Sequence, residues 1–274
     1  MTENIINMLM SAKGKATKSQ KVLIEYLLTS NLNDIIYLSI TELSDITGVG
    51  EATILRFCRV LGFKGYQDFK LVIAQEISPN LVIGEDKSYI TTIASNMIES
   101  INSSKDSTEL AVIEKVIDVL TESKNISIFG VGNSYVPALE LHNRLLKLGI
   151  LSYSEQGSHN QNIFTASLSK DDCVVLFSVS GCTKDVIEVA EIAKQHGVKI
   201  IVVTSHDKSP LAKYADIVVK CMRKESPTEG GSMLTKIGQL FIVDVISTGL
   251  SIRDLNHYNK CIKRASVAVV KKLV

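Results

Sequence analysis

Apolar residues in the first part of the chain recur three or four positions apart, which is the spacing of an amphipathic helix. Pro79 and Gly84 interrupt this pattern and predict a linker near 78–88. We therefore expect a helical domain over 1–78, followed over 79–123 by the linker and by helices that lead into the rest of the chain. The helices expected within the first domain include 17–30, two within 38–63, and 65–78.

Beyond residue 124, short apolar runs rich in Val and Ile alternate with helical stretches. This alternation is typical of a parallel sheet whose two faces are both covered by helices. The expected strands are 126–130, 150–154, 173–180, 198–205 and 217–221. The predicted fold class is thus α/β with an all-α N-terminal domain: a helix-turn-helix bundle, then a five-stranded doubly wound parallel α/β sandwich over 124–274.

Composition narrows the class of protein. The chain has 274 residues, of which 45% are apolar, and a formal net charge of +1, which argues against a chain-wide basic nucleic-acid binder. No run approaches the ~18 uninterrupted apolar residues of a membrane span, so no membrane partner is expected. The five cysteines are odd in number and show neither C-x-x-C spacing nor a His at zinc spacing. We accordingly expect no disulfide framework, no metal, no cofactor and a cytoplasmic location.

Residues 39–61 have the pattern of two helices joined by a tight turn. Ser39 and Glu42 are spaced as a capping box, and Gly48 permits the turn. The second helix, which begins near Gly50, would enter the major groove of DNA with its N-terminal residues at the base edges. The residues that this placement offers to bases or phosphates are Glu51, Thr53, Arg56 and Arg59 on the helix, and Lys64 and Lys70 after it.

Charge alone does not favour DNA binding, because residues 1–80 carry eight basic and eight acidic side chains. The run GVGEATILRFCRVLGFKGYQDFK at 48–70, however, closely resembles the N-terminal domain of RpiR/MurR-type bacterial transcription regulators. Gly50 departs from the family pattern, in which a Ser is usual. The resemblance implies that this helix reads double-stranded operator DNA. In the helix-turn-helix placement described above, Arg56 would contact a guanine, Thr53 a phosphate or a thymine methyl, and the two lysines phosphates.

Polar loops follow three of the expected strands. Residues 130–134 follow the first strand, 178–183 the third, and 204–209 the fourth, and all three segments are rich in Gly, Ser or Thr. Hydroxyl groups, backbone N–H groups and helix N-termini together form anion sites. In a sheet of order 2-1-3-4-5, the ligand crevice lies between strands one and three. The pattern therefore predicts a phosphate-sized pocket lined by hydroxyl groups.

Residues 124–255 resemble the sugar isomerase (SIS) domain, through the runs IFGVGNS, FSVSGCTKD, VTS and SPLAKYAD. In that family the Ser after the first Gly-rich loop and the Ser-x-Ser-Gly-x-Thr loop bind the phosphate of a phosphosugar. The resemblance assigns this role to Ser134, Ser178, Ser180 and Thr183, with Gly132, Asn133 and Gly181 in the same loops. Three further candidates lie elsewhere: His159 for sugar hydroxyls, Lys236 for the phosphate charge, and Glu229 near the start of the long C-terminal helix.

Two other functions are compatible with parts of the sequence. A dinucleotide site would need glycine where the chain has Tyr135, although Glu155 after the second strand leaves a ribose contact open. A phosphosugar isomerase with an accessory helical domain would need a general base, for which His159 and Glu229 are the only candidates. Neither residue lies in a recognised catalytic motif, and an isomerase has no need of a DNA-binding domain.

The two resemblances together imply a regulator rather than an enzyme. We expect a homodimer that presents two recognition helices to operator DNA, with half-sites about 10 bp apart or a multiple of that distance. A phosphosugar in the second domain would change operator affinity, by roughly 5- to 150-fold for ordinary coupling. The expected function is repression of a carbohydrate or amino-sugar catabolic operon, relieved by an N-acetylhexosamine 6-phosphate such as N-acetylmannosamine 6-phosphate.

Overall fold

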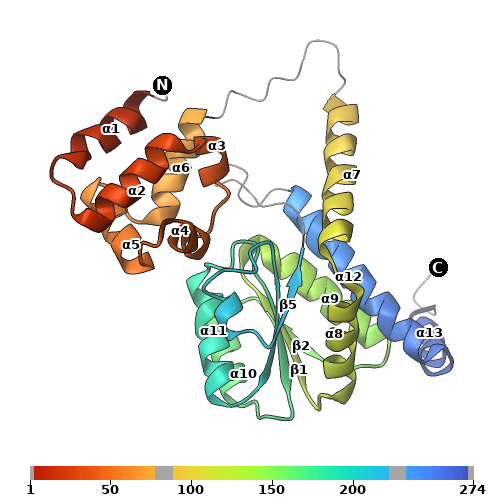
Figure 1. Ribbon diagram of the computed structural model, residues 1–274. Helices are drawn as coiled ribbons and strands as arrows, with labels where there is room; N and C mark the ends of the chain where they lie inside the picture. Colours follow the sequence, from red (N-terminus) through yellow and green to blue (C-terminus); the bar gives the residue numbers. More distant parts are fainter. Residues whose placement is uncertain (1–2, 78–88, 222–232, 271–274) are drawn as a thin grey trace. The chain divides into compact units, whose positions relative to one another are not determined.

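The computed structural model describes residues 3–77, 89–221 and 233–270 (Figure 1). Contacts between residues divide the described chain into two compact units, of which the first reaches Ile93 and the second begins at Ala94. Each unit is built around apolar residues of its own. A helical part and an α/β part thus follow each other along the chain, as the hydrophobic pattern predicts.

The first unit consists of helices that share one apolar core. They are α1 (Glu3–Lys13), α2 (Lys18–Thr29), α3 (Leu32–Ile35), α4 (Ile40–Thr47), α5 (Glu51–Val60) and α6 (Tyr66–Ile77). Leu27, Leu43 and Phe57 come from three of these helices and are each 2% exposed or less. Burial of one such side chain contributes about 1.5–3 kcal/mol. This packing, more than intrinsic helix propensity, stabilises helices as short as these.

The turn between α4 and α5 follows directly from its residues. The Ser39 hydroxyl accepts a hydrogen bond from the Glu42 amide (3.0 Å), and the Glu42 carboxylate accepts one from the Ser39 amide (2.7 Å). This is the predicted capping box. Gly48 ends α4 with a φ of 67°, a conformation that favours glycine. Gly50 is the N-cap residue of α5 and provides no side-chain cap. Both helices of the predicted motif, α4 and α5, are present.

The second unit contains a five-stranded parallel sheet in the order β2-β1-β3-β4-β5. This confirms the predicted doubly wound fold class. The strands are β1 (Ile126–Gly130), β2 (Tyr153–Glu155), β3 (Cys173–Phe177), β4 (Lys199–Thr204) and β5 (Ile217–Lys220). The helices are α7 (Tyr89–Ser107), which belongs to this unit from Ala94 onward, and then α8 (Leu110–Glu122), α9 (Tyr135–Lys147), α10 (Ser158–Ala166), α11 (Lys184–Gln195), α12 (Met233–Arg253) and α13 (Leu255–Val270). The unit also has the 3-10 turns η1 (Gly132–Ser134) and η2 (Ala212–Tyr214).

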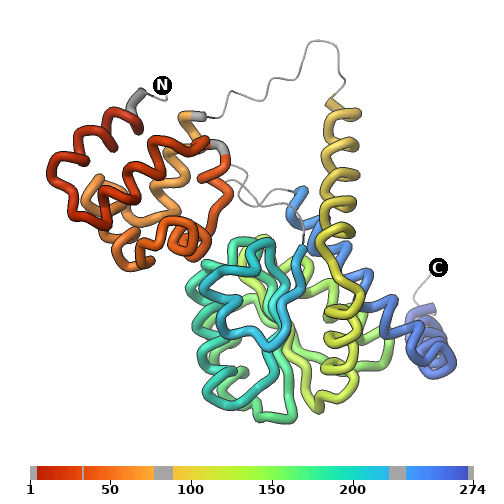
Figure 2. Tube along the Cα trace, in the orientation of Figure 1, coloured from red at the N-terminus to blue at the C-terminus, as the bar shows by residue number. Residues whose placement is uncertain are grey.

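Helices cover both faces of this sheet (Figure 2). Residues of α8, α9 and α12 pack on one face, and residues of α10 and α11 pack on the other. In β3, Val175 and Phe177 enter the first core, whereas Val174 and Leu176 enter the second, and all four are fully buried. Because both faces are buried, the strand is apolar throughout instead of alternating with polar residues.

Among the described residues, α12 is the one helix long and apolar enough to cross a membrane by length and composition. Its buried residues include Ile242, Val243 and Ile246, which belong to the core on the first face of the sheet. Packing in this core explains the apolar composition of α12, because a helix that is buried along much of its surface needs apolar residues there.

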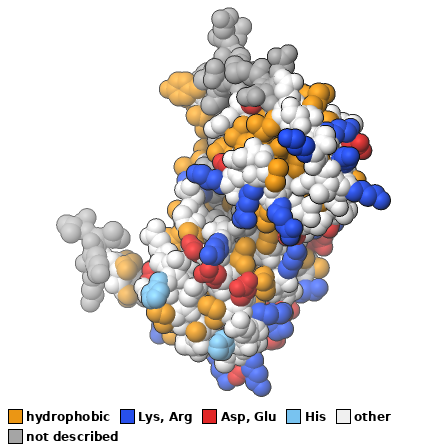
Figure 3. Space-filling view, turned by 90° about the vertical axis from the view of Figure 1, so that its left-hand side faces the viewer, with side chains coloured by type: hydrophobic (Ala, Val, Ile, Leu, Met, Phe, Trp, Pro, Cys, Tyr) orange, Lys and Arg blue, Asp and Glu red, His pale blue; other side chains and the backbone are white. Residues whose placement is uncertain are grey.

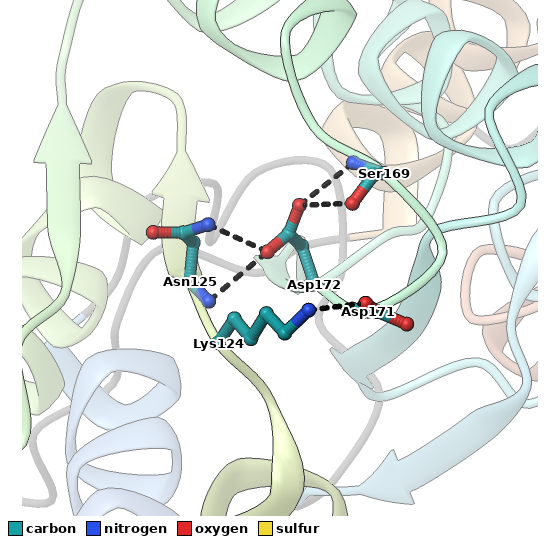
Figure 4. Close-up of polar contacts among 5 residues, drawn as sticks. All are labelled: Lys124, Asn125, Ser169, Asp171 and Asp172. Atoms are coloured by element: carbon teal, nitrogen blue, oxygen red, sulfur yellow. Dashed lines mark hydrogen bonds and ion pairs between the residues drawn. The ribbon is translucent and has the colours of Figure 1, made fainter.

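A buried carboxylate joins the chain segments that enter β1 and β3, at the amino edge of the sheet (Figure 4). Asp172 is 4% exposed and accepts hydrogen bonds from the Asn125 backbone amide (3.1 Å) and side-chain amide (2.7 Å). It also accepts hydrogen bonds from the Ser169 amide (2.7 Å) and hydroxyl (2.9 Å). Beside it, Lys124 and Asp171 form an exposed ion pair at 2.6 Å. Burial by itself raises the pKa of Asp172, but the hydrogen bonds from Ser169 and Asn125 outweigh it, and the pKa lies below its ordinary value.

Candidate functional sites

The loops after β1 and β3 leave the sheet side by side. Gly130 at the end of β1 is the pairing partner of Phe177 at the end of β3. The Ser178 amide then donates to the Val203 carbonyl of β4 (3.1 Å), so the second loop starts in register with the sheet. Both predicted pocket loops therefore begin at neighbouring points of the carboxyl edge, where the strand order reverses.

The first loop folds tightly back onto its strand. Gly130 permits this, because a Cβ at that position would lie 2.4 Å from the Ser134 carbonyl oxygen. Gly132 has a φ of 60° in the turn η1, and α9 begins directly afterwards at Tyr135. Ser134 is half-buried, while Gly132 and Asn133 are exposed. The turn thus presents a hydroxyl and an amide at the N-terminus of a helix, which suits an anion.

The second loop gathers hydroxyl groups. Ser178 is 2% exposed, and its Oγ lies 3.3 Å from Oγ1 of Thr183. The Ser180 hydroxyl accepts a hydrogen bond from the Cys182 amide (3.2 Å), and Gly181 has a φ of 61°. Thr183 is the N-cap residue of α11, yet its side chain makes no capping hydrogen bond. The Thr183 hydroxyl is therefore not accounted for by ordinary helix capping.

The third loop holds the second one in place. Thr204 is fully buried; its hydroxyl donates to the Val179 carbonyl (3.1 Å) and accepts from the His206 amide (3.2 Å). Ser209 is also fully buried and lies against Gly181, since a Cβ on Gly181 would fall 2.1 Å from the Ser209 hydroxyl oxygen. The hydroxyls of Thr204 and Ser209 thus support the pocket loops from inside the fold.

Of the three outlying ligand candidates, the structure joins one to the first loop. Lys236 lies in the first turn of α12, and its Nζ donates to Oδ1 of Asn133 at 3.4 Å. His159 is exposed on α10. Glu229 lies outside the described residues. An ammonium group therefore stands beside the loop that opens α9, where it adds positive charge to the helix N-terminus.

Gln161 was not predicted from the sequence but links the ends of two strands. It is fully buried on α10, and its Nε2 donates to the carbonyls of Glu155 (2.7 Å) and Gly130 (3.2 Å). The Glu155 carboxylate accepts hydrogen bonds from the amides of Gly157 and Gln156, and these bonds lower its pKa. Glu155 is thus engaged at the start of α10. A single Gln in a short helix carries no sequence pattern that indicates such a role.

The predicted DNA-contacting residues of the first unit reach the surface to different degrees. Arg56 and Arg59 on α5 are exposed, as is Lys64 after it, whereas Thr53 is half-buried. On the face drawn in Figure 3, Lys and Arg side chains form separate spots with apolar and neutral side chains between them. This distribution agrees with the small net charge of the chain.

Two predicted contact residues are engaged within the unit. Glu51 accepts a hydrogen bond from the Thr41 hydroxyl (2.8 Å), which ties α5 to α4. Lys70 is 4% exposed, and its Nζ donates to the Leu38 carbonyl (2.9 Å), which also accepts from the Tyr66 hydroxyl (3.2 Å). The prediction that Lys70 contacts phosphate is wrong, because its ammonium group lies buried where α6 packs against the segment that enters α4.

Comparison with known proteins divides the chain into the same two parts. Residues 3–80 match the helix-turn-helix domain of the rpiR family, and residues 119–248 match the SIS domain. An uncharacterized HTH-type transcriptional regulator of Clostridium perfringens is 36% identical over 255 residues, which are 89% of this chain and 91% of the relative. The HTH-type transcriptional regulator HexR of Escherichia coli is 28% identical over 274 residues, covering 97% and 94% of the two chains.

Among solved structures, the Vibrio vulnificus NanR protein complexed with ManNAc-6P is similar with a TM-score of 0.91. The match covers 98% of this chain and 99% of NanR at 24% identity, which is evidence for the fold alone. Membership of a family is instead shown by sequence similarity to the regulators named above, and this similarity spans both units. The chain belongs to the rpiR family of helix-turn-helix transcriptional regulators and carries a SIS domain as its C-terminal part.

Proposed function

We propose that this regulator represses a carbohydrate or amino-sugar catabolic operon and releases its operator when a phosphosugar binds at the carboxyl edge of β1 and β3. The observation that carries the proposal is the meeting of two hydroxyl-bearing loops at that edge. The Ser178 and Thr183 hydroxyls lie 3.3 Å apart, and Lys236 reaches Asn133 in the neighbouring loop. Hydroxyls, a helix N-terminus and a lysine are groups that bind phosphate.

Within this proposal, the phosphate is bound by hydroxyls and backbone amides of the two loops, and Lys236 balances its charge. The loop residues concerned are Gly132, Asn133, Ser134, Ser178, Ser180, Gly181 and Thr183. His159 and Glu229 remain candidates for the sugar hydroxyls. The effector that we propose is an N-acetylhexosamine 6-phosphate, since NanR, which has the same fold, is complexed with ManNAc-6P. Relatives that span both units are named regulators, which favours a sensor over a phosphosugar isomerase.

The proposed output is a change in affinity for double-stranded operator DNA. A homodimer presents two copies of α5 to half-sites about 10 bp apart or a multiple of that distance. Phosphosugar binding shifts the dimer toward an arrangement that fits these half-sites less well. Coupling of about 1–3 kcal/mol would change operator affinity by roughly 5- to 150-fold.

A panel of phosphosugars, tested by thermal shift against the same sugars without phosphate, should identify the effector. A specific ligand at tenfold excess over its Kd is expected to raise the free energy of unfolding by about 1.4 kcal/mol. Ser134→Ala should remove this gain, because the proposal places the Ser134 hydroxyl, half-buried in the first loop, among the groups that bind the phosphate. Ser167→Ala is the matched control, since the exposed Ser167 hydroxyl bonds only its own helix end, at the Phe164 carbonyl (2.7 Å). An undiminished gain in Ser134→Ala would contradict the pocket assignment.

Arg56→Ala should weaken specific operator binding by ~2 kcal/mol, because a guanidinium that reads guanine makes two hydrogen bonds in the major groove. Lys18→Ala is the matched control, since Lys18 is an exposed cation of the same unit on α2. Fluorescence anisotropy with operator DNA selected from a random pool would measure both affinities. An Arg56→Ala protein that keeps the wild-type affinity and sequence preference would remove Arg56 from base recognition.

A further inference from the structure

We propose that Leu55 reads a thymine in the operator through contact with its C5-methyl group, which makes Leu55 a specificity-determining residue of α5. The inference rests on the proposed function, in which α5 enters the major groove. Leu55 is 36% exposed, so part of its apolar side chain is accessible on the surface of α5. Its neighbours Ile54 and Phe57 on the same helix are each only 1% exposed.

Helix geometry places Leu55 on the face of α5 that carries two of the predicted DNA contacts, Arg56 and Arg59. Successive residues of an α-helix are rotated by about 100°. This rotation places four residues of α5 within one arc of about 100° on its exposed side: Ala52, Leu55, Arg56 and Arg59. All four are exposed, and Ala52 is too small to hinder close approach of a base pair. Leu55 therefore lies beside both arginines on the surface that would face DNA.

The chain also limits where the Leu55 side chain can lie. Its Cδ2 is 4.0 Å from the position that a Cβ on Gly65 would occupy, so the side chain lies near the turn before α6. Lys64, next to that glycine, is exposed and is a predicted phosphate contact. Leu55 therefore lies close to the segment that holds one of the predicted phosphate contacts.

The chemistry of the major groove then selects the partner. A leucine side chain neither donates nor accepts hydrogen bonds, and the one apolar group that a base pair displays in the major groove is the C5-methyl of thymine. Burial of one methyl-sized group between protein and base changes affinity by about fourfold. Leu55 is therefore expected to favour thymine at one position of each half-site.

Deoxyuridine provides a direct test, because it differs from thymidine only by lacking this methyl group. Full-length protein would first select an operator from random duplex DNA, and each thymine of that operator would then be replaced singly by deoxyuridine. The wild type is expected to lose about fourfold in affinity at one thymine per half-site. Leu55→Ala and Leu55→Gln should bind the thymine and deoxyuridine versions equally at that position.

Val60→Ala is the matched control. Val60 is 73% exposed and lies on the same helix, but it is the last residue of α5 and falls outside the arc that holds Leu55 and the two arginines. This variant should keep the wild-type loss at the sensitive thymine. Leu55→Gln, which preserves side-chain length, maintains the test if the alanine variant folds poorly.

The outcomes separate this inference from the proposed function. Failure of the wild type to select any DNA would contradict the proposed function itself. Selection of an operator at which no thymine is sensitive, or an unchanged loss in both Leu55 variants, would overturn the role of Leu55 alone. A Leu55→Ala protein with altered oligomeric state in sedimentation would also overturn it, because Leu55 would then contact a second copy of the chain.

Discussion

Replacing Gly181 with alanine is expected to lower the free energy of unfolding of the second unit by about 4 kcal/mol and to abolish stabilisation by phosphosugar. Gly181 has a φ of 61°, which costs an L-residue roughly 1–2 kcal/mol. Its new Cβ would also lie 2.1 Å from the Ser209 hydroxyl oxygen and 2.5 Å from the Ser209 Cβ. Overpacking of this kind adds about 1–3 kcal/mol. Ser209 is fully buried, so it cannot swing out into solvent to relieve the clash.

Gly132→Ala separates the two contributions. Gly132 has nearly the same φ, 60°, but a Cβ there would meet nothing within 4 Å. This variant should lose only ~1–2 kcal/mol, the cost of the left-handed conformation. The double variant Gly181→Ala/Ser209→Gly should recover part of the loss, because it removes the clashing side chain. Equal losses for both single variants in chemical denaturation would show that Ser209 does not confine the second loop.

Asp172→Ala should destabilise the second unit by about 3 kcal/mol, because it removes the charged acceptor of the hydrogen bonds from Asn125 and Ser169. Asn125 lies directly before β1 and Asp172 directly before β3, so the loss falls on two central strands of the sheet. Asp171→Ala is the matched control, since its ion pair with Lys124 is exposed and contributes little. Urea denaturation at pH 7 would compare the variants. A loss as small as that of the control would contradict this role.

The same carboxylate predicts the direction of a pH effect. The pKa of Asp172 in the folded chain lies below its ordinary value, because the hydrogen bonds from Ser169 and Asn125 outweigh the effect of burial. The stabilisation is therefore fully present above the unfolded-state pKa of about 3.9 and is lost as the pH falls through the lower folded-state value. Asp172→Asn should differ most from the wild type near neutral pH and converge with it in acid. A constant difference across this range would exclude the linkage.

Much of the fold is predictable because it depends on neighbours within a few residues. The predicted first strand, 126–130, coincides with β1, and the predicted capping box at Ser39 and Glu42 is present. The third strand was predicted to reach residue 180 but ends at Phe177. Residues after Phe177 leave the ladder because the Ser178–Thr183 segment turns to form the loop, a change that hydrophobicity alone does not reveal.

Lys70 shows how a polar residue can follow an apolar pattern. It lies four residues after Tyr66 and four before Ala74, both of which are buried, so helical spacing already places it on the inner face of α6. The sequence nevertheless favours a surface position for a lysine, because charged residues are rarely buried without partners. The Leu38 carbonyl supplies such a partner from 32 positions earlier in the chain, which no local pattern indicates.

The sequence by itself determined the two-part architecture, the capping and turn residues, the order and approximate positions of the strands, and the hydroxyl-bearing loops. These features follow from residue spacing and from local backbone preference. The tertiary structure alone decided which distant groups meet: Lys236 with Asn133 across 103 positions, and Asp172 with Asn125 across 47. Such contacts depend on strand pairing and on packing of helices against the sheet, which bring together side chains that have no relation in sequence.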